Sequence, residues 1–131
     1  MLTINIDGAS RGNPGNAAIG IIAKDKNKVV FEISEYIGKT TNNVAEYSAL
    51  IRALEELLIL GYKEAHFISD SQLIVEQIKG NYRVKDENLK ILYHQAKALI
   101  QKMSSFSIKH VVREENKTAD DLANKSLDNQ I

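Results

Sequence analysis

The spacing of hydrophobic residues changes along the chain from every second position to a helical period and back. Leu2, Ile4 and Ile6 alternate with polar residues, which is typical of a strand with one buried face. From Asn43 onward the hydrophobic positions recur every three or four residues, and Gly61 follows as a helix stop signal. The expected strands cover residues 2–7, 17–23, 29–37, 65–68 and 106–111, and the expected helices cover residues 43–60, 70–79, 86–103 and 117–128.

The order of these elements predicts the fold class. Three strands come first, and the later strands alternate with helices, which gives the order βββαβααβα. A strand followed by a helix and another strand requires parallel pairing with a right-handed crossover. We therefore expect an α/β fold with a mixed five-stranded sheet flanked by helices, and a single domain over residues 1–131.

Composition narrows the chemistry that the chain can perform. The 131 residues are 44% hydrophobic, which is enough for a packed core, and include no cysteine, which excludes disulfides, thiolate zinc sites and a cysteine nucleophile. The 17 basic residues balance 17 acidic ones, so any nucleic-acid binding must be local. Glu55 and Glu56 interrupt the most apolar helix, and the N-terminus lacks a secretory signal pattern. We expect a cytoplasmic protein that does not enter a membrane.

Four carboxylates stand out by their positions. Asp7 and Asp70 follow strands, and ligands of open α/β sheets collect beyond the carboxyl ends of strands. Glu46 and Asp120 each share a helical stripe with hydrophobic residues, so both are expected to face inward. An inward carboxylate is costly unless it is paired or bound to a metal. Because Mg²⁺ prefers oxygen ligands, the four acids together indicate magnesium and phosphate chemistry.

Each acid also has an ordinary structural interpretation. Asp7 followed by glycine is a common turn signal, and Asp70 before Ser-Gln-Leu is a good helix N-cap. Glu46 could form a salt bridge or interact with the helix dipole. The neighbouring Asp121 lines up with polar helix positions and is expected to face water.

Four motifs follow one another along the chain, and each carries one of the four acids. They are Asp7-Gly8-Ala9-Ser10-Arg11-Gly12-Asn13-Pro14-Gly15, Thr41-Asn42-Asn43-Val44-Ala45-Glu46, Ser69-Asp70-Ser71-Gln72 and Arg113-Glu114-Glu115-Asn116-Lys117-Thr118-Ala119-Asp120. In this order they resemble type 1 ribonuclease H, and the resemblance covers essentially the whole chain. It implies the same mixed five-stranded sheet. It also implies endonucleolytic cleavage of the RNA strand of RNA/DNA hybrids, which leaves 5′-phosphate and 3′-hydroxyl ends.

The resemblance further implies a metal site. In the two-metal mechanism two Mg²⁺ ions, or Mn²⁺ in their place, lie about 3.5–4 Å apart. By this resemblance Asp7 bridges both ions, Glu46 and Asp70 complete the ligands of one ion, and Asp120 serves the other. Four crowded carboxylates would repel one another without cations.

Polar residues near the acids are the candidate substrate contacts by the same resemblance. The 2′-hydroxyl distinguishes an RNA strand from a DNA strand, so discrimination must rest on it. These residues can equally form turns and caps, because Asn13 lies in a Gly-Asn-Pro-Gly turn and Thr41 or Asn42 can cap the first helix, where the family holds a DNA-strand phosphate. The candidates are Gly8, Ser10, Asn13, Thr41, Asn42, Asn43 and Gln72.

The auxiliary residue departs from the best-known bacterial pattern. Those enzymes carry a loop histidine before the last acid, whereas this loop offers Arg113, which resembles the arginine of archaeal-type relatives. We expect Arg113 to be the auxiliary catalytic residue, with His110 as a residue at a strand end. His66 and His94 are expected to have no catalytic role.

A second departure is the absence of the basic protrusion that many family members insert between the two middle helices. Residues 80–85 lead almost directly into the next helix, so hybrid binding should be weaker. Arg83, Lys85 and Lys90 are either a reduced contact surface or ordinary solvated charges. Similar compact relatives act on double-stranded RNA or RNA–DNA junctions, which are further candidate substrates, and we expect a monomer. The alternatives are a catalytically idle hybrid-binding module and another carboxylate-metal nuclease that acts on DNA junctions.

Overall fold

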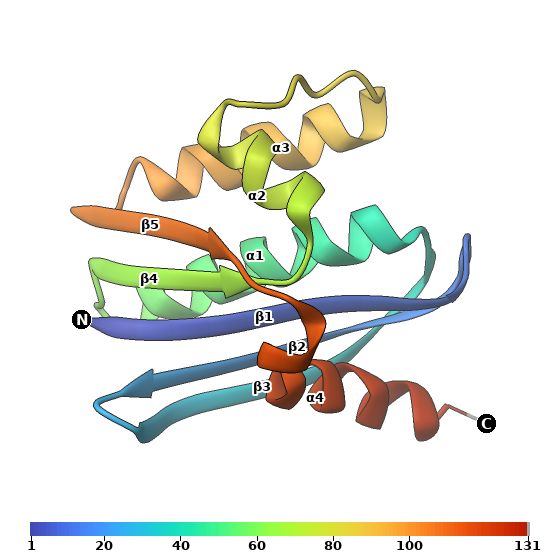
Figure 1. Ribbon diagram of the computed structural model, residues 1–131, viewed down its shortest axis with the longest axis horizontal. Coiled ribbons are helices and arrows are strands. Elements are labelled where there is room, and N and C mark those ends of the chain that lie inside the picture. Colours follow the sequence, from blue (N-terminus) through green and yellow to red (C-terminus); the bar gives the residue numbers. More distant parts are fainter. Residues whose placement is uncertain (131) are drawn as a thin grey trace.

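The computed structural model describes residues 1–130, and the elements follow the predicted order (Figure 1). One short 3-10 turn, η1 (Arg113–Glu115), precedes the last helix. The strands are β1 (Leu2–Gly12), β2 (Gly15–Asp25), β3 (Lys28–Thr40), β4 (Glu64–Ser69) and β5 (Ser105–His110), and the helices are α1 (Asn42–Ile59), α2 (Gln72–Lys79), α3 (Glu87–Ile100) and α4 (Lys117–Asp128).

The strands form one mixed sheet in the order β3-β2-β1-β4-β5. The first three strands pair antiparallel, whereas β4 is parallel to β1 and β5 is parallel to β4. Helices α1, α2 and α3 lie on one side of the sheet, and α4 lies on the other (Figure 1). The predicted α/β fold with a mixed five-stranded sheet is therefore confirmed.

The main core lies between the sheet and α1. Leu2, Ile4 and Ile6 are buried, as the alternation along β1 predicts, and they belong to the same cluster as Leu50 and Leu54 of α1. Burying each of these side chains contributes about 1.5–3 kcal/mol to the hydrophobic term. This packing fixes α1 across β1 and thereby fixes the position of Glu46 on the helix.

The opposite face of the sheet is covered by α4, whose buried side is narrow. Ala119, Ala123 and Leu127 recur every four residues and are buried. A Cβ on Gly20 of β2 would overlap the backbone of α4 at Ala119 and come within 2.6 Å of the Ala123 nitrogen. The helix therefore lies directly on the backbone of β2, which is closer than larger side chains would allow.

The end of β1 differs from the prediction. The strand continues through Asp7 to Gly12, whereas the alternating pattern ended at Asp7. Pairing between β1 and β4 stops at Ile6 and Ser69, and the rest of β1 pairs with β2 alone. Residues 8–12 are small or polar because this half of the strand has an uncovered edge, so hydrophobic alternation could not reveal it. Asp7 lies where the parallel part of the sheet ends, not where the strand ends.

Two helix starts also refine the prediction. Asp70 does not cap α2, because the Ser71 hydroxyl accepts the hydrogen bond from the Ile74 nitrogen at 3.3 Å. The Asp70 carboxylate is therefore not engaged in capping the helix. Thr41 caps α1 by accepting from the Val44 nitrogen at 3.3 Å, as the alternative interpretation of Thr41 predicted. Among residues 1–130, no helix combines the length and the hydrophobicity that crossing a membrane requires.

Candidate active site

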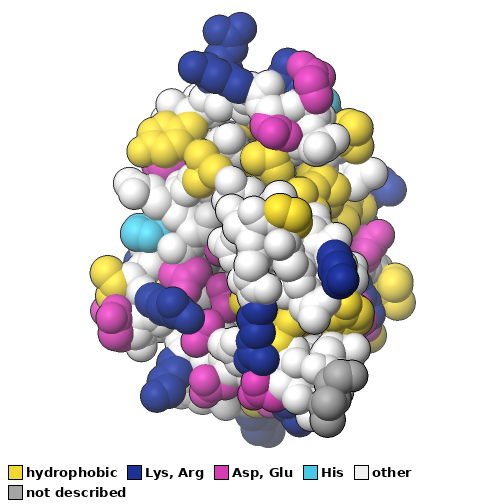
Figure 2. All heavy atoms as spheres, turned by 90° about the vertical axis from the view of Figure 1, so that its right-hand side faces the viewer, with side chains coloured by type: hydrophobic (Ala, Val, Ile, Leu, Met, Phe, Trp, Pro, Cys, Tyr) yellow, Lys and Arg dark blue, Asp and Glu magenta, His cyan; other side chains and the backbone are white. Residues whose placement is uncertain are grey.

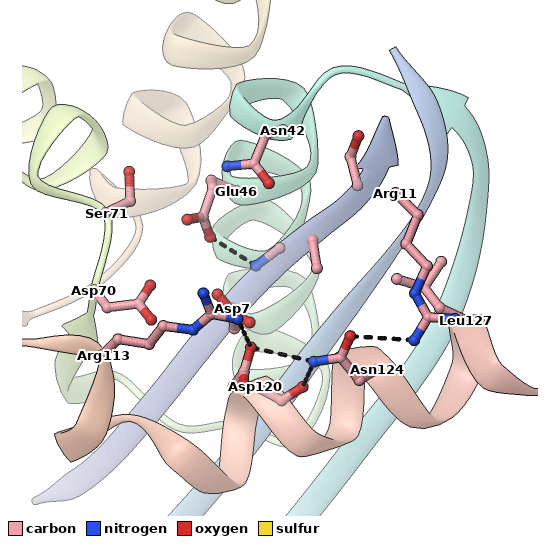
Figure 3. A pocket seen from close by; sticks show the side chains of 13 residues that line it. Asp7, Arg11, Asn42, Glu46, Asp70, Ser71, Arg113, Asp120, Asn124 and Leu127 are labelled. Atoms are coloured by element: carbon pink, nitrogen blue, oxygen red, sulfur yellow. Dashed lines mark hydrogen bonds and ion pairs between the residues drawn. The ribbon is translucent and has the colours of Figure 1, made fainter. Parts of the chain in front are cut away.

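A polar cleft of about 430 Å³ opens where β1 and β4 separate. On the face shown in Figure 2, acidic side chains gather near the middle, next to basic ones. Figure 3 shows the cleft from close by, with α1 behind it and α4 in front. The cleft is lined by Asp7, Gly8, Ala9, Ser10, Arg11, Asn42, Glu46, Asp70, Ser71, Arg113, Asp120, Asn124 and Leu127.

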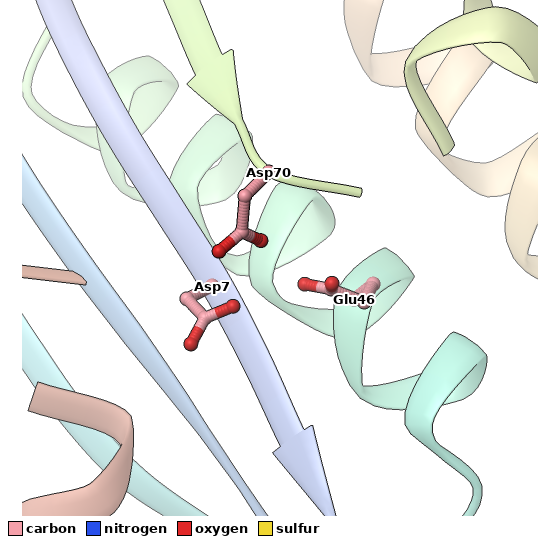
Figure 4. A group of neighbouring side chains, drawn as sticks. All are labelled: Asp7, Glu46 and Asp70. Carbon is pink, nitrogen blue, oxygen red and sulfur yellow. The ribbon is translucent and has the colours of Figure 1, made fainter. Parts of the chain in front are cut away.

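Three of the predicted acids meet in this cleft from three different elements (Figure 4). Asp7 comes from β1, Glu46 from the second turn of α1, and Asp70 from the residue that follows β4. One carboxylate oxygen of each lies within 4.8 Å of the others. Asp7 and Glu46 are 4% and 5% exposed, so two carboxyl groups of this cluster are almost removed from water. The prediction that Glu46 faces inward is confirmed.

Asp120, the fourth acid, approaches from the other side of the sheet. It lies in the first turn of α4, and its carboxylate contacts that of Asp7. The Asp120 side chain is 19% exposed, and its Oδ1 atom accepts from Arg113 Nη2 at 3.4 Å and from Asn124 Nδ2 at 3.3 Å (Figure 3). Asp121 is exposed, as predicted. All four acids of the sequence prediction therefore line one cleft.

Crowding and burial change the proton affinity of this group. Burial, followed by the charges of Glu46 and Asp70, raises the pKa of Asp7 to about 10. Burial also raises the pKa of Glu46 to about 8, against a hydrogen bond from the Gly8 nitrogen that lowers it. The pKa of Asp70 is raised as well, chiefly by burial. In the absence of a cation, the cleft therefore favours protonated carboxyl groups near neutral pH.

Backbone contact sets the distance between α1 and β1. The Gly8 nitrogen donates to Glu46 Oε1 at 2.6 Å, which orients the glutamate toward Asp7. A Cβ on Gly8 would overlap the backbone of Ala45 and Glu46, so only glycine allows this approach. The predicted Gly8 thus has a structural role in the site, whatever its role toward a substrate.

The remaining candidate substrate residues surround the cleft, but not all of them line it. Ser10 and Asn42 line it, and the Ser10 hydroxyl contacts the Gly12 carbonyl. Asn13 Oδ1 accepts from the Asn42 nitrogen at 3.0 Å and so joins the β1–β2 turn to the start of α1. Asn13 is not among the lining residues, and neither are three further candidates: Thr41, the cap of α1, Asn43, half-buried in its first turn, and Gln72, the exposed first residue of α2.

None of the three histidines is among the residues that line the cleft. His110 is the exposed last residue of β5, as expected for a strand end, and is not among the lining residues of the cleft. Arg113 does line it and contacts Asp120. His66 Nδ1 is 2.6 Å from the Ser107 hydroxyl on β5, and His94 packs edge-on against Tyr93 in α3.

Three supporting residues were not predicted as members of the site. Asn116 is 1% exposed, donates to the Ile6 carbonyl at 2.9 Å, and accepts from Asn5 at 2.9 Å, which ties the start of α4 to β1. Asn124 donates to Asp120, and Arg11 closes the far end of the cleft. All three are polar residues of kinds that are common on protein surfaces, so the sequence alone does not mark them as part of the site. Only their contacts with residues far away in the sequence show their roles.

The connection between α2 and α3 is short. Residues 80–86 link Lys79 to Glu87, and no helix is inserted there, as predicted. Arg83 and Lys85 are exposed, and Lys90 is 3.2 Å from Glu87. Together with Tyr82, Tyr93 and His94, Arg83 and Lys90 border a shallow groove that is separate from the acid cleft.

Fold and site thus define a protein of the ribonuclease H-like fold with a carboxylate centre. The chain matches a family model described as "Reverse transcriptase-like" over residues 5–126. The crystal structure of RNase H1 from the archaeon Halobacterium salinarum is similar with a TM-score of 0.93 and 41% identity, covering 97% of each chain. LC11-RNase H1 in complex with RNA/DNA hybrid is similar with a TM-score of 0.93 and 42% identity, covering 98% of this chain and 97% of that one.

A bifunctional protein of Mycobacterium tuberculosis is 43% identical over 129 residues, which is 97% of this chain. The chain spans 35% of the length of that relative and 62% of the length of Ribonuclease HI of Halobacterium salinarum, to which it is 42% identical. With the fold, the motifs and these similarities in agreement, the chain belongs to the type 1 ribonuclease H family.

Proposed function

We propose that the protein cleaves the RNA strand of RNA/DNA hybrids as a metal-dependent endonuclease. The observation that carries the proposal is the convergence of four acids, from β1, α1, the end of β4 and α4, in one open cleft. Concentrating acids in this way opposes folding unless a cation or a proton compensates the charge. A similar protein, LC11-RNase H1, has been crystallised in complex with RNA/DNA hybrid, which supports the choice of substrate.

The acid cluster fits a divalent cation. Two oxygen ligands on opposite sides of one Mg²⁺ are about 4.2 Å apart, since each lies about 2.1 Å from the ion. The carboxylate oxygens of Asp7, Glu46 and Asp70 already lie within 4.8 Å of one another, so small side-chain adjustments suffice. We assign one cation to these three acids and a second to Asp7 and Asp120, with Mg²⁺ as the expected metal and Mn²⁺ as the alternative. When bound, such ions lower the pKa of an attacking water and stabilise the charge on the leaving 3′-oxygen.

The chain's own residues supply orientation and charge. Gly8 holds Glu46 through its backbone nitrogen, while Asn124 holds the carboxylate of Asp120. The Arg113 guanidinium, 3.4 Å from Asp120, lowers the pKa of Glu46 and Asp70 through its charge. In the hydrolysis itself, the oxygen of water bonds to phosphorus and releases a proton, while the bond from phosphorus to the 3′-oxygen breaks and the 3′-oxygen takes up a proton. The products are a 5′-phosphate and a 3′-hydroxyl.

Recognition of the RNA strand is assigned to the polar residues around the acids. Gly8, Ser10 and Asn42 line the cleft, where they can contact sugars beside the cut. Asn13, Thr41, Asn43 and Gln72 lie at its border, on the turn before β2 and at the starts of α1 and α2. Contacts with sugar and phosphate rather than base edges give binding without sequence preference.

The decisive experiment is cleavage of an end-labelled RNA/DNA hybrid in Mg²⁺ and in Mn²⁺, beside duplex RNA, an RNA–DNA junction and duplex DNA. We expect metal-dependent cutting of the RNA strand alone, and a loss of at least about three orders of magnitude in Asp70→Asn. Asp121→Asn is the matched control, because Asp121 is an exposed aspartate next to Asp120. Hybrid binding without cutting would support an idle binding module, and cutting of duplex DNA would support a junction nuclease.

A further inference from the structure

Arg11 lies at the end of the acid cleft that is opposite Arg113. It is the second-last residue of β1 and, by the two-residue period of a strand, shares a face with Asp7. Figure 3 shows Arg113 on one side of the acids and Arg11 on the other, beyond Asn124. Among the described residues that line the cleft, the positively charged ones are these two arginines.

The spacing along β1 matches the spacing along α4. Arg11 is four positions after Asp7 along the strand, which is about 13 Å, and Asp128 is eight positions after Asp120 along the helix, which is about 12 Å. Asp120 contacts Asp7, and Asp128 contacts Arg11. Strand and helix therefore run side by side, and the backbone of Arg11 lies about 13 Å along β1 from that of Asp7.

The present partners of Arg11 hold it only weakly. Its Nη2 atom is 2.5 Å from Asp128 and 3.4 Å from Asn124, but the side chains of Arg11 and Asp128 are 49% and 66% exposed. Exposed ion pairs of this kind contribute little to stability, and water and salt compete with them. A guanidinium prefers the bidentate geometry that phosphate offers, so exchange of Asp128 for a phosphate has a small energetic cost.

A nucleic acid that enters this cleft meets four acids, which repel its phosphates until cations are bound. Positive charge at both ends of the cleft offsets that repulsion along the path of the backbone. We propose that Arg11 exchanges Asp128 for a phosphate of the bound nucleic acid, a short distance along the strand from the cut. Arg11 is then a substrate-binding residue. The inference rests on the proposed function for the identity of the ligand.

Another role of Arg11 would be to attach α4 to β1 through Asp128. The two roles predict opposite effects of removing Asp128. If the pair is structural, Arg11→Ala and Asp128→Asn both loosen α4 and weaken binding alike. If Asp128 competes with phosphate, Arg11→Ala weakens hybrid binding and Asp128→Asn strengthens it, while the melting temperature of both variants stays near that of the parent protein.

The experiment measures hybrid affinity against salt concentration with Mg²⁺ present, in an Asp70→Asn background that prevents cutting. One lost phosphate contact reduces the slope of log affinity against log salt by about 0.9. The affinity ratio of parent to Arg11→Ala should therefore shrink about 3.5-fold between 50 and 200 mM salt. Arg11→Lys should restore the slope, because it keeps the charge. Lys28→Ala, at the exposed first residue of β3, is the control for loss of one positive charge.

Parallel salt dependences for the parent and Arg11→Ala, or equal weakening by Arg11→Ala and Asp128→Asn, would overturn the inference. The proposed function has a separate test, which is cutting by the wild-type protein. If the wild-type protein cuts hybrid and Arg11→Ala leaves the slope of log affinity against log salt unchanged, only the proposed role of Arg11 is contradicted. If Arg11→Ala reduces that slope but the wild-type protein never cuts hybrid, the role of Arg11 stands and the proposed enzymatic function is contradicted.

Discussion

Asp7 and Gly20 are directly paired across β1 and β2, and the missing side chain of Gly20 allows α4 to bring Asp120 to Asp7. The backbone of Ala119 lies where a Cβ of Gly20 would be, and Asp120 is the next residue of the helix. A glycine that carries no chemistry therefore sets the distance between two of the acids.

Replacing Gly20 with alanine should displace α4 from the sheet. We expect a stability loss of about 1–3 kcal/mol from overpacking, and a fall in hybrid cleavage of at least about tenfold because Asp120 moves with the helix. Thermal melting and steady-state kinetics measure the two effects.

The matched control for this change is Gly38→Ala. Gly38 has a φ of +91° and no atom within 4 Å of its virtual Cβ, so alanine there adds backbone strain without a clash. This control should lose stability but keep its activity per folded molecule. Wild-type activity in Gly20→Ala would show that the close approach of α4 is dispensable.

The metal-free protein should lose stability as the pH rises from about 5 to about 9. Asp and Glu titrate near pH 4 in an unfolded chain, whereas the pKa is about 10 for Asp7 and about 8 for Glu46 in the folded protein. Between these limits the folded state binds more protons, so each increase in pH favours unfolding. The effect should amount to a few kcal/mol, and denaturant titrations in EDTA at several pH values would measure it.

The same titrations on Asp7→Asn give the comparison. Asparagine removes one buried charge, so this variant should be more stable than the wild type at pH 8 and should show a weaker pH dependence. A stability of the wild type that is constant or rises over this pH range would contradict the raised pKa values.

Replacing Arg113 with alanine should affect the reaction more than replacing His110. Arg113 lines the cleft and lowers the pKa of Glu46 and Asp70, so its removal raises both pKa values. We expect about a tenfold lower kcat for Arg113→Ala, with the acid limb of the pH–rate profile moved to higher pH. His110→Ala should behave as the wild type. An unchanged pH profile in Arg113→Ala, or a large loss in His110→Ala, would reverse the assignment.

Asn116→Ala should weaken the attachment of α4 to β1. The buried side chain donates to the Ile6 carbonyl and accepts from Asn5, and an unsatisfied buried polar group costs about 1–3 kcal/mol. We expect a loss of stability of that size and a higher Mg²⁺ concentration at half-maximal cleavage, because Asp120 is less well held. Asn129→Ala, an exposed change just after α4, is the control. Equal Mg²⁺ requirements in both variants would limit Asn116 to a structural role.

The sequence predicted the architecture and the four acids because both depend on local patterns. Alternation located the start of β1, and helical spacing placed Glu46 on the buried side of α1. The pattern failed at Asp7, where β1 loses β4 as a partner and its residues stop alternating. The sequence pattern also predicted Asp70 as the N-cap of α2, whereas the structure has Ser71 in that role. Aspartate and serine are both good N-cap residues, so local propensity cannot choose between them.

Residues that act across the fold left no local signal. Asn116 looks like a helix cap, yet its side chain makes no capping bond and reaches β1 instead. Gly20 lies in an apolar strand, where a glycine normally destabilises the strand. Its role becomes clear only from the structure, in which the backbone of α4 packs directly against it. Such roles depend on which elements become neighbours in the folded protein, and local sequence patterns do not contain that information.

Gly8 and Gly20 place the backbones of α1 and α4 against the sheet, so the acids on these helices cannot spread apart to relieve their repulsion. The repulsion between the carboxylates can therefore be reduced only by a positive ion or a proton that binds between them. If the proposed divalent cations bind here, they compete with protons for one rigid pocket, because the raised pKa values of Asp7 and Glu46 mean that protons are released when a cation takes their oxygens. Protons from the solution thus act on this protein as a competing ligand. The backbone contacts at Gly8 and Gly20 set the strength of that competition, because they fix how closely the acids are held together.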